Sequence, residues 1–212
     1  MGRENGLSAA ERERRVASPA GQRLVAAARE SVRRRGVAGT TFDRIAPEAD
    51  VSRGSIAWYF GTKDRLLAEV MRADSDRRLA RMREKLPPAR SSEELIAAFG
   101  ELLDDFLDGA GGPQVVLGEM ASVALRNEEI RAAQVELRRR WRSELAAMLE
   151  RKVEEGVIAL PGSPEAAAAL LTALAEGIAI ETACDPDWNP REAIAQAAIA
   201  ARSVIGKASA PA

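Results

Sequence analysis

Residues 41–67 read TFDRIAPEADVSRGSIAWYFGTKDRLL, and this stretch predicts two short helices joined by a tight turn. Apolar residues at helical spacing predict a first helix over Asp43–Ala49. Asp50 is expected in the turn, because aspartate is one of the few residue types besides glycine that tolerate a left-handed backbone. Ser52 is a suitable N-cap for a second helix over Arg53–Tyr59. The pattern is that of a helix-turn-helix, whose second helix enters the major groove of DNA.

A longer string of residues around this pattern carries a family resemblance. Its members are Thr40, Thr41, Phe42, Ile45, Ala46, Ala49, Val51, Ser52, Gly54, Ile56, Trp58, Tyr59, Phe60, Lys63, Asp64, Leu66 and Leu67. The string resembles the DNA-binding domain of the TetR/AcrR family of one-component bacterial repressors, over roughly the first third of the chain. Asp50 stands where that family usually has glycine, and Ala57 stands where an aromatic residue is common.

Seven residues are expected to contact DNA. Arg53 and Ser55 begin the second helix and therefore face the groove first, and arginine bound to guanine through two hydrogen bonds is the commonest specific contact. The resemblance implies further contacts with phosphates, and Lys63 also lies at a helix N-terminus, which suits an anion. The expected DNA-binding residues are Thr41, Arg53, Gly54, Ser55, Trp58, Tyr59 and Lys63.

Composition narrows the class of protein. The chain has 212 residues, of which 46% are hydrophobic and 30% charged, with one cysteine (Cys184) and no histidine. These values are ordinary for a soluble globular protein. No apolar run approaches eighteen residues and no signal peptide is recognised, so we expect a cytoplasmic protein with no membrane partner. We find no metal-ligand cluster, phosphate-binding loop or nucleophile–base pair, so we expect no cofactor, no metal and no enzyme.

The charges are unevenly distributed. Residues 1–65 hold 13 Lys+Arg and 8 Asp+Glu, a net charge of +5, whereas the rest of the chain carries −6. A basic N-terminal part is typical of a protein that binds phosphates at one end. Together with the resemblance, this favours a ligand-responsive repressor that binds a palindromic operator in double-stranded DNA and is released from it by a small-molecule effector. The alternatives are an all-α enzyme and a helical scaffold that binds another protein.

Helical periodicity continues to the C-terminus, and no segment alternates as a strand does. We therefore expect an all-α fold of about nine helices. It would combine an N-terminal three-helix helix-turn-helix domain with a larger helical domain for effector binding and dimerisation. The expected divisions are a mostly disordered arm over 1–19, the DNA-binding domain over 20–65, the helical domain over 66–207 and a flexible tail over 208–212.

The resemblance implies an effector pocket among the middle helices. Candidate lining residues are Phe99, Leu103, Phe106, Glu119, Met120, Val123, Trp141 and Leu145. Glu119 lies among apolar neighbours, and a buried carboxylate needs a partner, which would be either Arg126 or a cationic ligand. Gly156-Val157-Ile158 and Glu176-Gly177 resemble the branch that includes the choline-sensing repressor. The acidic C-terminal part, and Glu119 with the aromatic rings of Phe106 and Trp141, favour a cationic or amphipathic effector, with a neutral hydrophobic one as the alternative.

The last two predicted helices are rich in alanine and apolar on at least one side. In the resembled family, such helices pair with their copies in a four-helix bundle. A two-fold dimer would also let two DNA-binding domains read a palindromic operator. The expected interface residues are Leu170, Leu174, Ile178, Ile194, Ala198, Ala201 and Ile205. The alternative is that these helices only close the core of a monomer.

Overall fold

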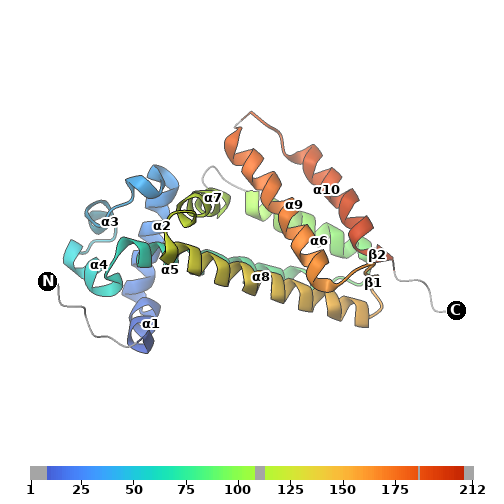
Figure 1. The fold of residues 1–212 in the computed structure, drawn as a ribbon, viewed down its shortest axis with the longest axis horizontal. Coiled ribbons are helices and arrows are strands. Elements are labelled where there is room, and N and C mark those ends of the chain that lie inside the picture. Colours follow the sequence, from blue (N-terminus) through green and yellow to red (C-terminus); the bar gives the residue numbers. More distant parts are fainter. Residues whose placement is uncertain (1–8, 108–112, 186, 208–212) are drawn as a thin grey trace. The chain divides into compact units, whose positions relative to one another are not determined.

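The computed structural model describes residues 9–107, 113–185 and 187–207 (Figure 1). Ten helices occur within these residues, which confirms the all-α class and adds one helix to the number expected. Two strands of two residues each, β1 (Ile158–Ala159) and β2 (Gly206–Lys207), form a short antiparallel pair. Ile158 is opposite Lys207, and Ala159 is opposite Gly206.

The chain divides into two compact units. The first, here called the head unit, comprises Met1–Ala73 and Glu119–Gln134. The second, the body unit, comprises Asp74–Gly118 and Val135–Ala212. This division differs from the boundary expected after residue 65, because residues 66–73 and 119–134 also belong to the head unit.

The head unit contains four complete helices. They are α1 (Ala9–Ala17), α2 (Pro19–Gly39), α3 (Phe42–Glu48) and α4 (Arg53–Phe60). The unit also takes the first part of α5 (Lys63–Lys85) and of α8 (Glu128–Glu154), and the last part of α7 (Pro113–Ala124). α1 packs against α2 and α4, and α3 packs against α2 and α4 (Figure 1).

Helix α1 corrects the expectation of a disordered arm over residues 1–19. Residues 9–17 are helical, whereas residues 1–8 lie outside the described part of the chain. The Arg15 guanidinium lies 3.7 Å from the centroid of the Trp58 ring. Arg15 Nη1 also donates to the Trp58 carbonyl at 3.3 Å. These contacts come from α4, forty-three residues away, so the local sequence of the arm does not reveal them.

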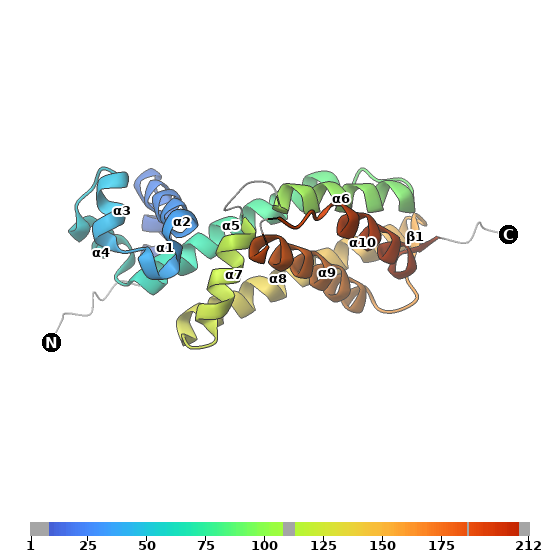
Figure 2. The same cartoon turned by 90° about the horizontal axis from the view of Figure 1, so that it is seen from above.

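The body unit is built from the rest of α5 and α8 together with α6 (Ser92–Leu107), α9 (Pro164–Cys184) and α10 (Arg191–Val204). Figure 2 shows α9 beside α10, and both pack against α6. The main core of this unit includes Leu79, Leu86, Leu95, Leu145, Leu149 and Ile205.

Side-chain caps fix the beginnings of several helices, and the predicted cap Ser52 is one of them. In five helices a backbone amide of the first turn donates to the side chain three residues earlier, at 3.0 to 3.2 Å. The pairs are Ser55 with Ser52, Arg65 with Thr62, Glu94 with Ser91, Ile130 with Asn127, and Ala166 with Ser163. Each cap satisfies an amide that has no partner within its own helix.

Candidate DNA-binding helix and effector cavity

The turn between α3 and α4 has the geometry that the sequence predicts. Asp50 has a φ of 52°, in the left-handed region. The Val51 amide donates to the Ala46 carbonyl at 3.0 Å and so closes the end of α3. Ile45 and Ile56 are buried, and they join the two helices through the interior of the head unit. The turn and the shared core therefore hold α4 at a fixed angle to α3.

One side of α4 is open to solvent. Arg53 and Gly54 are exposed, Trp58 is 49% exposed, and Ser55 and Tyr59 are half-buried. Arg53 Nε lies 3.2 Å from Asp43 Oδ1, and both side chains are more than two-thirds exposed. An exposed pair of this kind contributes little stability, so Arg53 is available to another acceptor. The side of α4 predicted to read DNA is thus accessible, although its contacts with DNA remain a prediction.

The peptide groups on both sides of Val37 form a second feature of the head unit. The Val37 amide donates to Glu119 Oε2 at 2.7 Å. Lys63 Nζ donates to the Val37 carbonyl at 2.5 Å. Gly36, just before Val37, has a φ of +69°, and a Cβ there would lie 2.8 Å from Glu119 Oε1. Glycine is therefore favoured at position 36 by its left-handed backbone, and a side chain there would also displace the Glu119 carboxylate.

These bonds change the interpretation of two predicted site residues. Glu119 was expected to bind Arg126 or a cationic effector, but its carboxylate accepts from a backbone amide in the head unit instead. Lys63 was expected to bind phosphate. Its ammonium has three donors, and the Val37 carbonyl takes one of them, so a phosphate contact of Lys63 stays a prediction.

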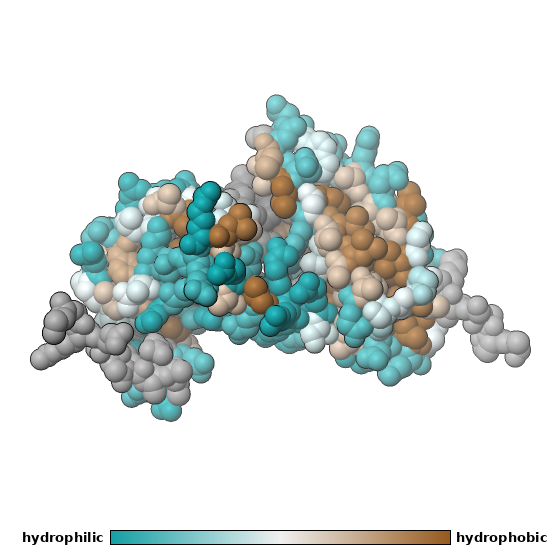
Figure 3. Space-filling model, in the orientation of Figure 1, coloured by the Kyte–Doolittle hydropathy of each residue, from teal (hydrophilic) through white to brown (hydrophobic). Residues whose placement is uncertain are grey.

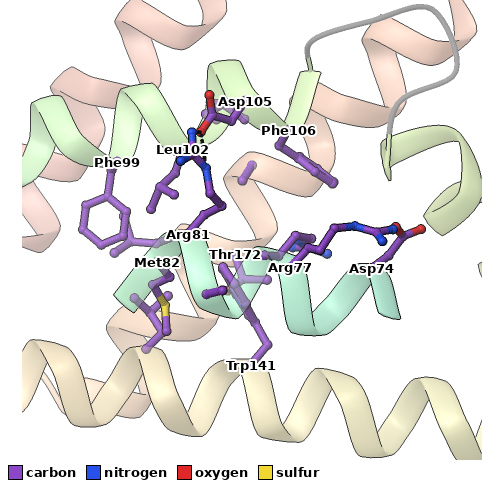
Figure 4. Close-up of a pocket in the computed structure, with 16 residues that line it drawn as sticks. Asp74, Arg77, Arg81, Met82, Phe99, Leu102, Asp105, Phe106, Trp141 and Thr172 are labelled. Atoms are coloured by element: carbon purple, nitrogen blue, oxygen red, sulfur yellow. Dashed lines mark hydrogen bonds and ion pairs between the residues drawn. The ribbon is translucent and has the colours of Figure 1, made fainter. Parts of the chain in front are cut away.

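A cavity of about 540 Å³ lies inside the body unit. Its walls come from α5, α6, α8 and α9 (Figure 4). The volume is within the range of about 300–1,000 Å³ that small-molecule sites occupy. The lining is mainly apolar and aromatic, and its polar members are Asp74, Arg77, Arg78, Arg81, Asp105 and Thr172.

The carboxylates near this cavity are paired with arginines other than Arg78. The pairs are Arg77 with Asp74, Arg81 with Asp105 at 2.8 Å, and Arg138 with Glu176 at 2.8 Å. Figure 4 shows Arg81 reaching from α5 to Asp105 on α6. Within the described residues, Arg78 forms neither an ion pair nor a hydrogen bond through its guanidinium.

Arg78 instead stacks on two aromatic rings. Its guanidinium carbon lies 4.5 Å from the centroid of Phe106 and 4.7 Å from that of Trp141. Burial lowers the pKa of Arg78, while the charges of Glu176 and Asp74 oppose that shift. Trp141 is itself fixed, because its Nε1 donates to Thr172 Oγ1 at 3.1 Å and Thr172 donates to the Ala168 carbonyl at 2.7 Å.

Five of the eight predicted effector residues line this cavity, namely Phe99, Leu103, Phe106, Trp141 and Leu145. Glu119, Met120 and Val123 do not line it, and all three belong to the head unit. Arg78 was not predicted. A signal for it was present in the sequence, since Arg78 continues the spacing of Leu67, Met71 and Asp74 on the inner side of α5.

The side of α9 and α10 that faces away from the body core carries exposed apolar residues. Leu170, Ile180 and Ile199 are 48%, 55% and 51% exposed. Leu170 and Ile180 lie on α9, where they are interspersed with the exposed small residues Ala166, Ala173 and Gly177. Ile199 lies on α10. Apolar side chains gather over the C-terminal helices in Figure 3. By length and composition α9 also qualifies as a membrane-spanning helix, and it is the one such helix in the described part of the chain.

The seven predicted interface residues are distributed over different environments. Leu170 is exposed, whereas Leu174, Ile178, Ile194 and Ala198 are half-buried within the body unit. Ala201 and Ile205 are buried in the core of their own unit, which corrects their assignment to an interface. The physical reason is that α10 packs against α6 with this side, a contact that apolar periodicity cannot distinguish from one with a second copy.

Comparison with known proteins gives the class of the chain. The model of the bacterial regulatory proteins of the tetR family matches residues 24–70. The model of the C-terminal region of the BetI-type transcriptional repressor matches residues 101–206. The search of curated proteins found no match.

Solved structures share the fold over almost their entire length. A transcriptional regulator from Rhodococcus sp. Rha1 is 26% identical with a TM-score of 0.73, and the match covers 92% of this chain and 100% of that one. A regulator from Saccharomonospora viridis, solved with choline, is 20% identical (TM-score 0.73; 91% and 97% covered). FadR from Bacillus subtilis, solved with stearoyl-CoA, is 18% identical (TM-score 0.72; 87% and 99% covered).

The chain therefore belongs to the tetR family of bacterial regulatory proteins. It is a DNA-binding transcription regulator and not an enzyme. The helix-turn-helix lies in the segment that the N-terminal family model covers, and much of the cavity lining lies in the segment that the C-terminal model covers.

Proposed function

We propose that the protein is a homodimeric repressor that binds a palindromic operator through α4 and releases it when a small molecule enters the body-unit cavity. One observation carries the proposal. The same chain holds an open recognition helix in its head unit and a cavity of ligand size, about 540 Å³, in its body unit. α5 supplies residues to both units, and Lys63 and Arg78 are examples.

Ligand control is supported by the solved relatives. One of them was solved with choline and another with stearoyl-CoA. The two ligands differ in charge and size, so the relatives support a small-molecule effector for this chain without fixing its chemistry. A ligand changes DNA affinity only through a difference in its affinity for two arrangements of the protein.

Dimerisation is supported by the exposed apolar side of α9 and α10, here called the outer face (Ala166, Leu170, Ala173, Gly177, Ile180 and Ile199). Small residues allow two helices to approach closely. A two-fold pairing of this face would bury Leu170 and Ile180 against their copies. The opposite side of α9 packs inside the body unit through Ala167, Ala168 and Ala179, which favours a protein interface over a membrane span. We accordingly place the protein in the cytoplasm.

The experiment is a selection of duplexes from a random pool by the purified full chain, followed by binding measurements on the enriched sequence. Repression predicts an enriched sequence with two inverted half-sites, bound by a dimer. It also predicts that a reporter placed behind this sequence falls in expression when the protein is present. An increase in reporter expression would show that the protein is an activator. Failure to enrich any sequence would contradict specific DNA binding.

A further inference from the structure

The cavity of the body unit contains a cation, Arg78, that no carboxylate in the described part of the chain neutralises by direct contact. Asp74 and Asp105 line the cavity, and each is bound to its own arginine. Arg78, the third arginine of the lining, has no carboxylate in contact within the described residues. Because arginine stays charged in proteins, the lining of three arginines and two aspartates has a net charge of +1.

The stacking of Arg78 leaves its hydrogen-bond donors available. The rings of Phe106 and Trp141 contact the guanidinium at 4.5 and 4.7 Å and attract it through their faces. A guanidinium has five N–H donors that lie in its plane, and ring faces do not replace an oxygen acceptor for them. A carboxylate matches two of these donors at once and supplies the missing charge.

Aromatic ring faces and the Glu119 carboxylate are the groups that could hold a cationic effector, and both are already engaged. The faces of Phe106 and Trp141 are occupied by the guanidinium of Arg78. The carboxylate of Glu119 accepts from the Val37 amide and does not line the cavity. A cation in the cavity would therefore meet a net positive charge, and the two carboxylates of the lining are each already bound to an arginine.

The apolar part of the site extends beyond the main cavity. A second pocket of about 70 Å³ is lined only by apolar residues and glycine. It shares Phe99, Leu103, Leu171 and Ala175 with the main cavity, so the two spaces adjoin. A ligand with a long apolar part would bury it there and gain about 25 cal/mol for each Å² of apolar surface removed from water.

We infer that the effector is an amphipathic carboxylate, with its charged group bound to Arg78 and its apolar part among Phe99, Leu103 and Leu171. This inference rests on the proposed function, because it names the ligand class of the proposed effector site. It keeps the amphipathic character that the sequence favours, but gives the effector a carboxylate in place of a cationic group.

The test compares ligands with the same apolar part and different polar groups. The probes are decanoate, decan-1-ol and decyltrimethylammonium, together with 4-phenylbutyrate and 4-phenylbutan-1-ol. Binding to the full chain, without DNA, is measured by titration calorimetry and by the fluorescence change of tryptophan. At least one carboxylate is expected to bind at least tenfold more tightly than its alcohol, and decyltrimethylammonium is expected to bind least.

Variants of Arg78 assign this preference to one side chain. R78Q should weaken the binding of the carboxylate at least tenfold and leave the binding of the alcohol unchanged. R78K keeps the charge but loses the planar pair of donors, so it should fall between R78Q and the wild type. The matched control is R139Q, an exposed arginine of α8, which should bind every probe as the wild type does. Circular dichroism checks that each variant folds.

Three results would overturn the inference. In the first, the cation binds more tightly than the carboxylates. In the second, the carboxylates bind no better than their alcohols. In the third, R78Q loses affinity for the alcohol and for the carboxylate by the same factor. The wild-type comparison decides the case even if R78Q does not fold. The proposed function is tested separately, because a carboxylate that binds through Arg78 without changing operator affinity would contradict induction and leave the ligand class intact.

Discussion

Val37 is held on both sides by side chains that are distant in sequence. Its amide donates to Glu119 and its carbonyl accepts from Lys63, at 2.7 and 2.5 Å. Val37 itself is buried, so water cannot easily replace either partner. An unsatisfied buried amide costs about 1–3 kcal/mol, which makes Glu119 a stabilising residue of the head unit.

Glu119→Ala is therefore expected to lower the free energy of unfolding by about 1–3 kcal/mol, because the Val37 amide loses its acceptor. Glu119→Gln retains an oxygen acceptor and should cost less. Urea unfolding of the full chain, followed by circular dichroism, measures both changes. Glu128→Ala, at an exposed position of α8, serves as the control and should change little. Equal stability of the wild type and Glu119→Ala would show that the bond contributes nothing.

Arg53 Nε lies 3.2 Å from Asp43 Oδ1, at the start of the predicted recognition helix. If Arg53 reads a guanine, Arg53→Ala should cost about 1–3 kcal/mol on operator DNA and much less on random DNA. Asp43→Asn should tighten binding to both, because it removes a negative charge beside the groove-facing arginine. Fluorescence anisotropy with the two duplexes measures these differences. An equal loss on both duplexes in Arg53→Ala would rule out base reading.

The sequence predicts residues well where the relevant partners are local. It identifies the left-handed Asp50 and five of the cavity residues. It also indicates that Glu119 needs a partner, but it cannot find that partner, since the Val37 amide is 82 residues away and every residue except proline carries such a donor. Arg78 is missed because arginine on a helix is usually exposed, and only the packing of α6 and α8 shows the rings beside it.

At the scale of elements, helix boundaries follow from caps that lie within three residues of the amides they bind. Three elements that the sequence misses, the helix α1 and the strands β1 and β2, depend on distant contacts. α1 is packed against α4 through Arg15 and Trp58. The pair of β1 and β2 joins Ile158 to Lys207, and strands of two residues are too short for a period of two to be recognised.

The outer face of α9 and α10 gives a prediction at the element scale. If two copies pair through it, Ile180→Glu would bury a carboxylate without a partner, at a cost of several kcal/mol to the dimer. Because Ile180 is 55% exposed within the protomer, the monomer should stay folded. Sedimentation velocity should therefore show a folded monomer, and operator affinity should fall sharply.

Val153→Glu is the matched control for that change, since Val153 is also an exposed apolar residue but lies on α8. It should leave the oligomeric state unchanged. Ile205→Glu, by contrast, introduces the charge into the core of the body unit and should unfold the protein. A dimer that survives Ile180→Glu would place the interface on another surface.

At the scale of the whole molecule, the family assignment joins two activities in one chain. The sequence predicts both from the helix-turn-helix string and from the resemblance it carries. It predicts the ligand poorly, because the charge of the cavity depends on which arginine each aspartate binds. Asp74 pairs with Arg77 within α5, but the pairs of Asp105 with Arg81 and of Glu176 with Arg138 join different helices and are set by helix packing.

Induction requires that binding of the effector lowers the affinity of the protein for the operator. A hundredfold drop in operator affinity corresponds to about 2.7 kcal/mol of coupling, within the usual range for allosteric proteins. The coupling is reciprocal, so a saturating operator must weaken effector binding by the same factor. With the tightest carboxylate probe, both dissociation constants should therefore change by one common factor, here expected to be between ten and a hundred.

Arg78→Gln separates the binding of the effector from the release of the operator. The variant should bind operator as the wild type does when no probe is present, because Arg78 lies in the body unit and not in the helix-turn-helix. It should need at least tenfold more carboxylate for release, since the probe has lost its partner. Once saturated with probe, it should release operator as fully as the wild type if Arg78 serves binding alone. Saturation without release would instead show that the contact with Arg78 is what distinguishes the two arrangements of the protein.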